Sequence, residues 1–297
     1  MTDFKGKTAF ITGAASGIGL GMARAFGREG MNVVIADIDE GAAKSVAHRL
    51  ASEQIKAAPV HIDVADRGSV RAAALEAVAA FGKIHVVCNN AGIGVAGEIG
   101  KIKESDWEWI LDVNLKGVVY GTETFLPLIR SHGEGGHFVN TASLAGLISG
   151  PGMEPYSATK YAVVAMSEGW AIQLAQENIG VSVLCPGFVR TRIYESGRAR
   201  QDKYGGKADT AVLGGDREAG RQAILAGIDP DIVGARVVEA VKAGELYIIT
   251  HPNFRPIVEM RLQAIRAAFD AADNSQALKQ VKEWAPVPNL GGPQGQQ

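Results

Sequence analysis

Short apolar segments of strand length alternate along the chain with longer segments in which apolar residues recur at helical spacing. The strand-like segments are residues 8–12, 32–36, 57–62, 85–89, 137–142, 181–185 and 246–249. Helix-length segments lie between them, at residues 17–29, 40–52, 67–81, 106–131, 156–177 and 231–243. Strands that are apolar on both faces are typical of a parallel sheet covered by helices on each side. The alternation therefore predicts an α/β fold, a doubly wound parallel sheet of about seven strands in a single domain.

Two regions interrupt this alternation. Residues 188–229 are long, polar and glycine-rich, which is typical of a lid inserted over a binding site. After the last predicted strand, residues 254–272 have helical apolar spacing, whereas residues 285–297 are rich in Pro, Gly and Gln and are expected to be disordered. The pattern thus divides the chain into a main domain of residues 1–250, a helical extension of residues 251–284 and a tail of residues 285–297.

Composition excludes several classes of function. Thirty Lys and Arg residues against 32 Asp and Glu residues give a net charge of −2, which disfavours nucleic acid as a partner. No apolar run approaches the ~20 residues needed to cross a bilayer, so no membrane partner is expected. The cysteines, Cys88 and Cys185, lie in apolar segments, which indicates reduced thiols and a cytoplasmic location. The six histidines show no spacing typical of metal ligands, so no metal is expected.

A glycine-rich turn, Thr12-Gly-Ala-Ala-Ser-Gly-Ile-Gly19, follows the first predicted strand and opens the first predicted helix. Without side chains at Gly13, Gly17 and Gly19 the backbone can turn sharply and approach a pyrophosphate, which the helix N-terminus attracts. A turn without a ligand is the alternative. The strand before it, the helix after it and a carboxylate downstream favour the binding role.

That carboxylate is Asp37, which lies 18 residues after Gly19, at the end of the second predicted strand. There it can accept hydrogen bonds from both hydroxyls of an adenosine ribose, although a solvated turn aspartate is the alternative. A 2′-phosphate would meet like charge, at a cost of roughly 4 kcal/mol per charge pair at 4 Å and an effective dielectric of 20. Neither Ala14 nor Ala15 supplies a compensating cation. We therefore expect the cofactor to be NAD rather than NADP.

Several motifs occur in order over about residues 5–250: the glycine turn, Asn89-Asn-Ala-Gly92, Asn114, Ser143, Tyr156-x-x-x-Lys160, Pro186-Gly187 and Thr191. This ordered set resembles the short-chain dehydrogenase/reductase family in its single-domain branch. The resemblance implies a Rossmann fold, a nicotinamide cofactor and hydride transfer to or from an alcohol carbon.

The chemistry of each motif supports this resemblance. Hydride transfer from an alcohol requires removal of the hydroxyl proton, and a tyrosine can remove it if its pKa falls from about 10 toward the working pH. Tyr156 and Lys160 are four residues apart and share one helix face, so the ammonium can stabilise the phenolate. The Ser143 hydroxyl can polarise the substrate oxygen. Asn114, at the centre of the long helix predicted over residues 106–131, would by resemblance hold a water that links Lys160 to solvent.

Further cofactor contacts follow from the resemblance. Ser16 and Ile18 belong to the glycine turn, and Asp63 and Val64 would meet the adenine. Asn90, Ala91 and Gly92 would let the backbone pass close to the dinucleotide. The remaining contacts would come from Pro186, Gly187, Val189 and Thr191, together with Tyr156 and Lys160. Residues that flank the catalytic set could line the substrate pocket: Gly94, Leu144, Met153 and Phe188.

These features predict an NAD-dependent oxidoreductase that acts on a secondary alcohol or ketone with an apolar or aromatic body. Residues 246–255 resemble the tail of bacterial family members that oxidise aromatic secondary alcohols. A ketoacyl-thioester reductase and a non-catalytic NAD(H)-binding regulator are the alternatives. Asp37 and the long lid disfavour the first alternative, and the intact catalytic set disfavours the second. The two long helices, residues 106–131 and 156–177, would by resemblance form a homodimer or homotetramer.

Overall fold

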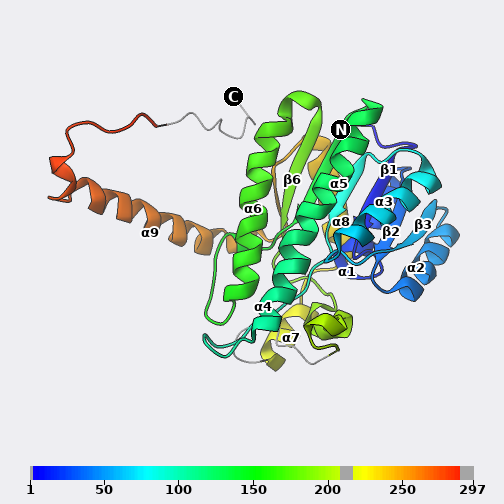
Figure 1. Ribbon diagram of the computed structural model, residues 1–297, viewed down its shortest axis with the longest axis horizontal. Helices are drawn as coiled ribbons and strands as arrows, with labels where there is room; N and C mark the ends of the chain where they lie inside the picture. Colours follow the sequence, from blue (N-terminus) through cyan, green and yellow to red (C-terminus); the bar gives the residue numbers. More distant parts are fainter. Residues whose placement is uncertain (1–2, 208–216, 288–297) are drawn as a thin grey trace.

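The computed structural model describes residues 3–207 and 217–287 and contains a seven-stranded, entirely parallel sheet in the order β3-β2-β1-β4-β5-β6-β7. Phe10 on β1 pairs with Val34 of β2 on one side and with Val87 of β4 on the other. The strand order reverses between β1 and β4, where α/β sheets bind ligands beyond the carboxyl ends of their strands. The predicted doubly wound fold is confirmed (Figure 1).

The predicted strands are present with small shifts of their ends. The strands are β1 (Thr8–Thr12), β2 (Asn32–Asp37), β3 (Ala57–His61), β4 (Val86–Asn89), β5 (Gly136–Thr141), β6 (Ile179–Cys185) and β7 (Tyr247–Ile249). The helices are α1 (Gly17–Arg28), α2 (Glu40–Ser52), α3 (Arg67–Phe81), α4 (Glu104–Leu111), α5 (Gly117–His132), α6 (Glu154–Leu174), α7 (Arg217–Leu225), α8 (Pro230–Ala243) and α9 (Arg255–Asp273).

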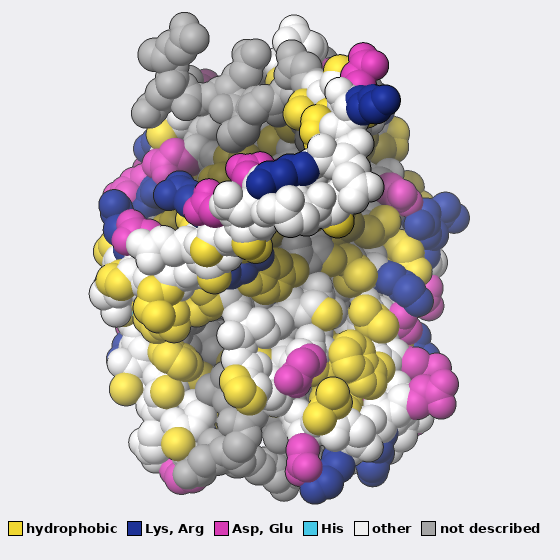
Figure 2. Space-filling view, turned by 90° about the vertical axis from the view of Figure 1, so that its left-hand side faces the viewer, with side chains coloured by type: hydrophobic (Ala, Val, Ile, Leu, Met, Phe, Trp, Pro, Cys, Tyr) yellow, Lys and Arg dark blue, Asp and Glu magenta, His cyan; other side chains and the backbone are white. Residues whose placement is uncertain are grey.

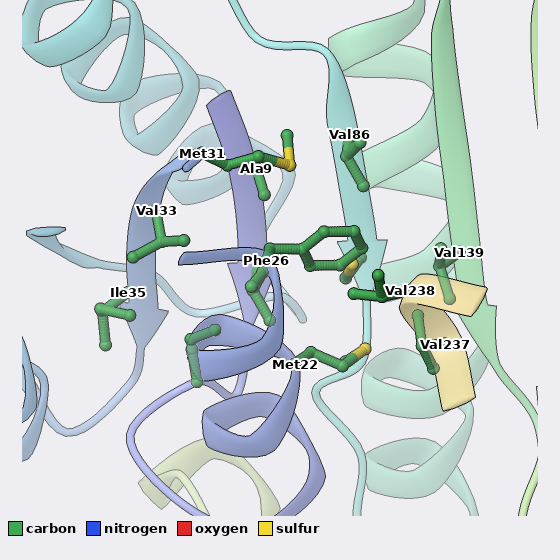
Figure 3. Packing of buried hydrophobic residues seen from close by; sticks show 14 of the residues in the cluster. Ala9, Met22, Phe26, Met31, Val33, Ile35, Val86, Val139, Val237 and Val238 are labelled. Atoms are coloured by element: carbon green, nitrogen blue, oxygen red, sulfur yellow. The ribbon is translucent and has the colours of Figure 1, made fainter. Parts of the chain in front are cut away.

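Alternating side chains of the strands build a core on each face of the sheet. Ala9 and Ile11 of β1 point to the face covered by α1, α2 and α8, where Met22 and Phe26 pack against them (Figure 3). Phe10 points to the opposite face, which α3, α4, α5 and α6 cover. Its ring lies 4.4 Å from that of Phe125, centroid to centroid. Burial on both faces explains why the strands are nearly continuous apolar runs.

The helix predicted over residues 106–131 is present, but it contains a π-helical turn that the sequence did not indicate. Helix α4 ends at Leu111, a π-helical turn occupies Asp112–Lys116, and α5 follows from Gly117. A π turn holds one extra residue and is frequently found at functional sites. Here it contains Asn114, whose fully buried side chain bonds to the backbone of Ile93, 21 residues earlier in the chain. This tertiary contact lies outside what helical spacing can indicate.

The two irregular regions contain regular elements of their own. The lid, residues 188–229, includes 3-10 helices at Ile193–Ala199 and Asp202–Tyr204 and the helix α7. The predicted helix of the extension is confirmed as α9, which projects from the body as an arm (Figure 1). Of the tail predicted to be disordered, residues 288–297 lie outside the described residues. No described helix is long and apolar enough to cross a membrane.

Candidate active site

The glycine turn is tied to the loop after β4. Thr12 Oγ1 accepts hydrogen bonds from the backbone N–H groups of Asn90 and Ala91, each at 2.9 Å. The Asn90 amide donates to the Thr12 carbonyl at 2.9 Å. A Cβ at Gly13, whose φ is +65°, would lie only 3.0 Å from the Cα of Ala91. The two loops therefore lie against each other, which requires a glycine at position 13.

The start of α1 fits the pyrophosphate of a dinucleotide. Ser16 is the N-cap of α1, but its side chain makes no capping hydrogen bond, and no acidic residue stands in the first turn. The N-terminal N–H groups therefore remain suited to an anionic ligand. A Cβ at Gly19 would lie 2.3 Å from the Gly13 carbonyl oxygen, and one at Gly17 would lie 3.0 Å from the Thr191 methyl group. Only glycine lets the turn close in this way.

Two carboxylates stand at the carboxyl ends of the neighbouring strands β2 and β3: Asp37 is the last residue of β2, and Asp63 follows β3. The Asp37 carboxylate accepts from the N–H of Ala15 and from that of Asp39, both at 3.0 Å, so its orientation is fixed. Asp63 Oδ1 accepts from the N–H of Ala65 at 2.9 Å. Both acids line one end of a single large cavity.

The other end of this cavity contains the predicted catalytic side chains. Lys160, which is 3 % exposed, donates from Nζ to the carbonyl of Thr141 at 2.8 Å, and its Nζ lies 5.6 Å from the centre of the Tyr156 ring. Ser143 follows β5 and begins a 3-10 turn, where its Oγ accepts from the N–H of Ala145 at 3.1 Å. Helix α6 and the carboxyl end of β5 thus bring Ser143, Tyr156 and Lys160 together.

Burial shifts the pKa of both titratable groups of this set. Burial raises the pKa of the Tyr156 phenol, while hydrogen bonding from Ser143 acts in the opposite direction. Burial lowers the pKa of Lys160 to about 8. Without a bound ligand, Tyr156 is therefore protonated at neutral pH. Lys160 is positively charged there and loses its proton as the pH rises above about 8.

Asn114, in the π turn, is hydrogen-bonded both to the loop after β4 and to α6. Its Oδ1 accepts from the N–H of Ile93 at 2.8 Å, and its Nδ2 donates to the Ile93 carbonyl at 2.9 Å and to Thr159 Oγ1 at 3.3 Å. A Cβ at Gly92 would lie 3.4 Å from Asn114 Oδ1 and 3.6 Å from Lys160 Nζ. Asn114 thus holds the loop after β4 beside Lys160, and its role in a water relay stays a prediction.

The cavity has a volume of about 490 Å³ and joins the two ends of the site. All the predicted cofactor residues line it except Gly19, which packs beneath the turn. Leu144, Met153 and Phe188 also line it, whereas Gly94 does not. The N–H of Gly94 instead donates to Ser196 Oγ, a residue of the cavity wall, at 3.0 Å. The site is therefore one continuous cleft that can hold an extended ligand beside a second, smaller one.

Comparison with known proteins decides the family. The family model for short chain dehydrogenases matches residues 7–202. The chain belongs to the short-chain dehydrogenase/reductase family. The glycine turn, the free helix N-terminus and the paired loops fit the nicotinamide dinucleotide that this family binds.

Individual relatives of this dehydrogenase/reductase match most of its length. The CLA biosynthesis dehydrogenase/reductase of Lactiplantibacillus plantarum is 36 % identical over 272 residues, which are 89 % of this chain and 95 % of the relative. The C alpha-dehydrogenase of Sphingobium sp. (strain NBRC 103272 / SYK-6) is 36 % identical over 267 residues, 89 % of this chain and 87 % of the relative. A crystal structure of a family member from Burkholderia phymatum in complex with NAD superposes with a TM-score of 0.85 at 36 % identity, covering 90 % and 97 % of the two chains.

Sequence reasoning missed several residues that the fold of this dehydrogenase/reductase brings to the cavity. The lid contributes Arg198 and Gln201, and the extension contributes Phe254 and Ile257. The positive charge of Arg198 is close enough to interact with the carboxylates of Asp37 and Asp39. These residues come from irregular or distant segments, and no spacing within the sequence indicates them.

The extension is joined to the cavity wall through His251. The N–H of Gly187 donates to His251 Nδ1 at 3.1 Å, and the remaining ring nitrogen, Nε2, lies 3.0 Å from the Phe188 carbonyl oxygen. Nε2 must therefore carry the proton and donate it to that carbonyl. This arrangement fixes the loop after β6 to the start of α9.

The spacing of the histidines also gave no indication of a cluster that lies at the amino ends of the strands, at the opposite end of the sheet from the cavity. His85, His132 and Glu134 present ligand atoms within 4.8 Å of one another. The four ring nitrogens already have protein partners: Thr8 N and Glu134 Oε2 for His85, and Ile84 O and Glu134 N for His132. The fold brings together His85, which precedes β4, and His132 and Glu134, at and just after the end of α5, so their spacing in the sequence does not reveal the cluster.

Proposed function

We propose that the protein is an NAD-dependent dehydrogenase/reductase that interconverts a secondary alcohol and a ketone with an apolar or aromatic body. The observation that carries this proposal is the convergence of Ser143, Tyr156 and Lys160 on a cavity that continues into the glycine turn. A proton-transfer group and a dinucleotide cradle in one cleft support hydride transfer coupled to proton transfer.

Each catalytic side chain has a distinct role in this proposal. The bound nicotinamide accepts or supplies the hydride. The Tyr156 hydroxyl donates a proton to the ketone oxygen in reduction and removes the alcohol proton in oxidation. The Ser143 hydroxyl holds the substrate oxygen and stabilises its developing negative charge. The Lys160 ammonium favours the phenolate form of Tyr156 by its charge.

The chemistry of the cavity wall supports an apolar substrate. Beside the catalytic residues, the wall is formed by Ile93, Leu144, Ile148, Met153, Phe188, Ile193, Ile224, Phe254 and Ile257. The rings of Phe188 and Phe254 lie 6.3 Å apart, a spacing at which aromatic groups interact. A mostly apolar wall with few polar groups binds an apolar body with one reactive oxygen. The name of the C alpha-dehydrogenase relative is consistent with oxidation at a carbinol carbon.

The preference for NAD over NADP rests on the charges around Asp37. Asp37 and Asp39 contribute two negative charges where the adenosine ribose would lie, and Arg198 contributes one positive charge. A 2′-phosphate would therefore meet a net negative environment.

Turnover with NAD tests this function directly. Purified protein is mixed with NAD and aliphatic, alicyclic, steroidal or benzylic secondary alcohols, and the appearance of NADH is followed. We expect turnover of a benzylic or another apolar class, and a loss of at least a hundredfold in kcat for Tyr156→Phe without loss of NADH binding.

Other outcomes of this experiment separate the alternatives. Binding of NADH without turnover of any alcohol or ketone would favour a non-catalytic regulator. Turnover confined to ketoacyl thioesters would favour the thioester reductase. A Tyr156→Phe variant as active as the wild type would contradict the catalytic role of Tyr156.

We propose further that the protein is a cytoplasmic homodimer or homotetramer. Both cysteines are free and buried, which suits a reducing compartment. Helix α6 exposes Ala158, Ala165, Gly169 and Ile172 on its outer side, so a second copy could pack closely against it.

A further inference from the structure

The start of the C-terminal extension forms part of the cavity wall. Phe254 ends a 3-10 turn at Pro252–Phe254 and comes directly before α9, and both Phe254 and Ile257 line the cavity. These two residues lie outside residues 7–202, which the family model matches. The pattern shared by the family therefore does not explain why they are at the site.

The position of Phe254 is fixed by its contacts with His251 and Phe188. The centre of its ring lies 6.0 Å from that of His251, nearly edge-on, and 6.3 Å from that of Phe188. The His251 ring accepts from the N–H of Gly187 and donates to the Phe188 carbonyl, so it holds the backbone on which Phe188 stands. A Cβ at Gly187 would lie 2.8 Å from the His251 ring, so only glycine allows this approach.

The same loop is attached to the reacting end of the cavity. The Pro186 carbonyl accepts from the N–H of Leu144 at 2.9 Å and from Ser143 Oγ at 3.4 Å. Phe188 follows Pro186 by two residues. The two phenyl rings therefore stand on a loop that is bonded to the side chain expected to hold the substrate oxygen.

Both rings are accessible to a ligand in the cavity. Phe188 is 38 % exposed and Phe254 is partly exposed. Because the two rings lie against each other, a third ring cannot enter between them and can pack only on the side that faces the cavity. Another aromatic ring gains an offset or edge-to-face contact there in addition to apolar burial. A saturated ring of the same size gains the burial alone.

We propose that Phe188 and Phe254 form an aromatic wall that recognises an aryl ring attached to the carbinol carbon, and that His251 is the positioning residue of this wall. The proposal rests on the function proposed above, since it requires the carbinol oxygen to lie at Ser143. It makes the C-terminal extension a determinant of substrate choice.

Two ketones of similar size test the wall without turnover. Acetophenone has a planar aromatic ring and cyclohexyl methyl ketone has a saturated ring, and neither can be reduced by oxidised NAD. Their Kd values for the protein saturated with NAD are measured by ligand-observed NMR titration. Phe254→Leu removes the ring and keeps an apolar side chain, whereas Phe254→Tyr keeps the ring. Phe269→Leu is the matched control, since Phe269 is exposed on α9 and does not line the cavity.

The ratio of the two Kd values in each variant is compared with that of the wild type, because the two ketones also differ in hydration. We expect Phe254→Leu to reduce the preference for acetophenone about two- to tenfold, the contribution of one aromatic pair. Phe254→Tyr and Phe269→Leu should keep the wild-type ratio. An unchanged ratio in Phe254→Leu, or a wild type with bound NAD that binds neither ketone, would overturn the aromatic wall.

Replacement of His251 tests its positioning role. His251→Ala should reduce the preference for acetophenone by a similar factor, and combining it with Phe254→Leu should reduce the preference no further, since both changes remove the same contact. A purely structural role would weaken both ketones equally and leave the ratio unchanged, which would overturn the assignment of His251.

Turnover separates this inference from the proposed function. Oxidation of NADH in the presence of either ketone is followed with the wild type and with Phe254→Leu. Turnover together with an unchanged Kd ratio would contradict the aromatic wall alone. A wild type that binds NADH and acetophenone but turns over no alcohol or ketone would contradict the proposed function instead.

Discussion

Asp37 carries both a structural and a binding role. Its two carboxylate oxygens accept from backbone N–H groups in the glycine turn and after β2, so the side chain is oriented before any ligand arrives. Each oxygen has a further lone pair for a ribose hydroxyl. In the proposed function, the residue that would select the cofactor is thus held by the turn that would bind its pyrophosphate.

Replacing Asp37 should change the choice of cofactor. We expect Asp37→Ser to weaken NADH binding about tenfold or more, because it removes two charge-assisted hydrogen bonds, and to strengthen NADPH binding, because it removes like charge. Arg198→Gln should act in the opposite direction on NADPH. Titrations of both variants with both cofactors, with thermal unfolding as the check on folding, measure these shifts. Equal effects of Asp37→Ser on the two cofactors would contradict a role in discrimination.

Strand β5 contains a buried histidine that makes the fold sensitive to acid. His137 Nε2 bonds to Ser182 Oγ on β6 at 2.8 Å, and Ser182 in turn donates to the Glu245 carbonyl. His137 must therefore donate its Nε2–H to Ser182, which both the neutral and the protonated ring can do, so that burial decides between the two forms. Burial lowers its pKa to about 3, from an ordinary value of 6.5.

This shift predicts a pH window for stability. Between about pH 6.5 and 3 the unfolded chain binds a proton that the native state does not, so the free energy of unfolding falls as the pH falls. The contribution of one proton is at most about 1.4 kcal/mol per pH unit. His137→Asn should be less stable at pH 7 but should lose less stability between pH 6.5 and 4.5 than the wild type in urea unfolding. The exposed His48→Asn should follow the wild type, and an identical pH slope for His137→Asn would disprove the assignment.

The elements differ in how far the sequence could predict them. The strands and most helices follow from local periodicity. The glycine turn follows from the positive φ of Gly13 and Gly17 and from the close approach of the backbone at Gly19, which a side chain would prevent. The π turn was missed because it depends on the contact of Asn114 with Ile93. The lid residues were missed because Gln201 meets Asp63 only after the whole sheet has formed. Contacts between distant segments therefore limit the prediction of the site more than local propensity does.

At the scale of the whole molecule, the arm α9 presents apolar side chains that the rest of the described chain does not bury. None of its 19 residues is buried, and Ile257, Met260, Leu262, Ile265 and Phe269 are 40–70 % exposed. Hydrophobic side chains also gather in patches on the face of the body from which the arm projects (Figure 2). An isolated helix of this length is only marginally stable in water, so the arm requires a surface to pack against.

The balanced charges of the arm favour packing against a second copy of the chain rather than against a membrane. Arg255, Arg261 and Arg266 are balanced by Glu259, Asp270 and Asp273, whereas helices that lie on membranes carry an excess of Lys and Arg. In a two-fold dimer each arm can pack on the other subunit in the same way, beside the exposed side of α6. We therefore expect the proposed oligomer to depend on the apolar side of α9.

Sedimentation of charged variants tests this dependence. Ile265→Glu combined with Phe269→Glu, two exposed positions one helical turn apart, places charge on the apolar side and should shift the wild-type dimer or tetramer toward smaller species by at least tenfold in Kd. Gln263→Glu combined with Ala267→Glu adds the same two charges on the opposite side of the helix and should leave the distribution unchanged. Both substitutions lie beyond the residues of α9 that line the cavity, so NADH binding should be retained and reports that the body is folded. A wild type that sediments as a monomer at micromolar concentration, or a double variant that assembles like the wild type, would show that the arm does not join two copies.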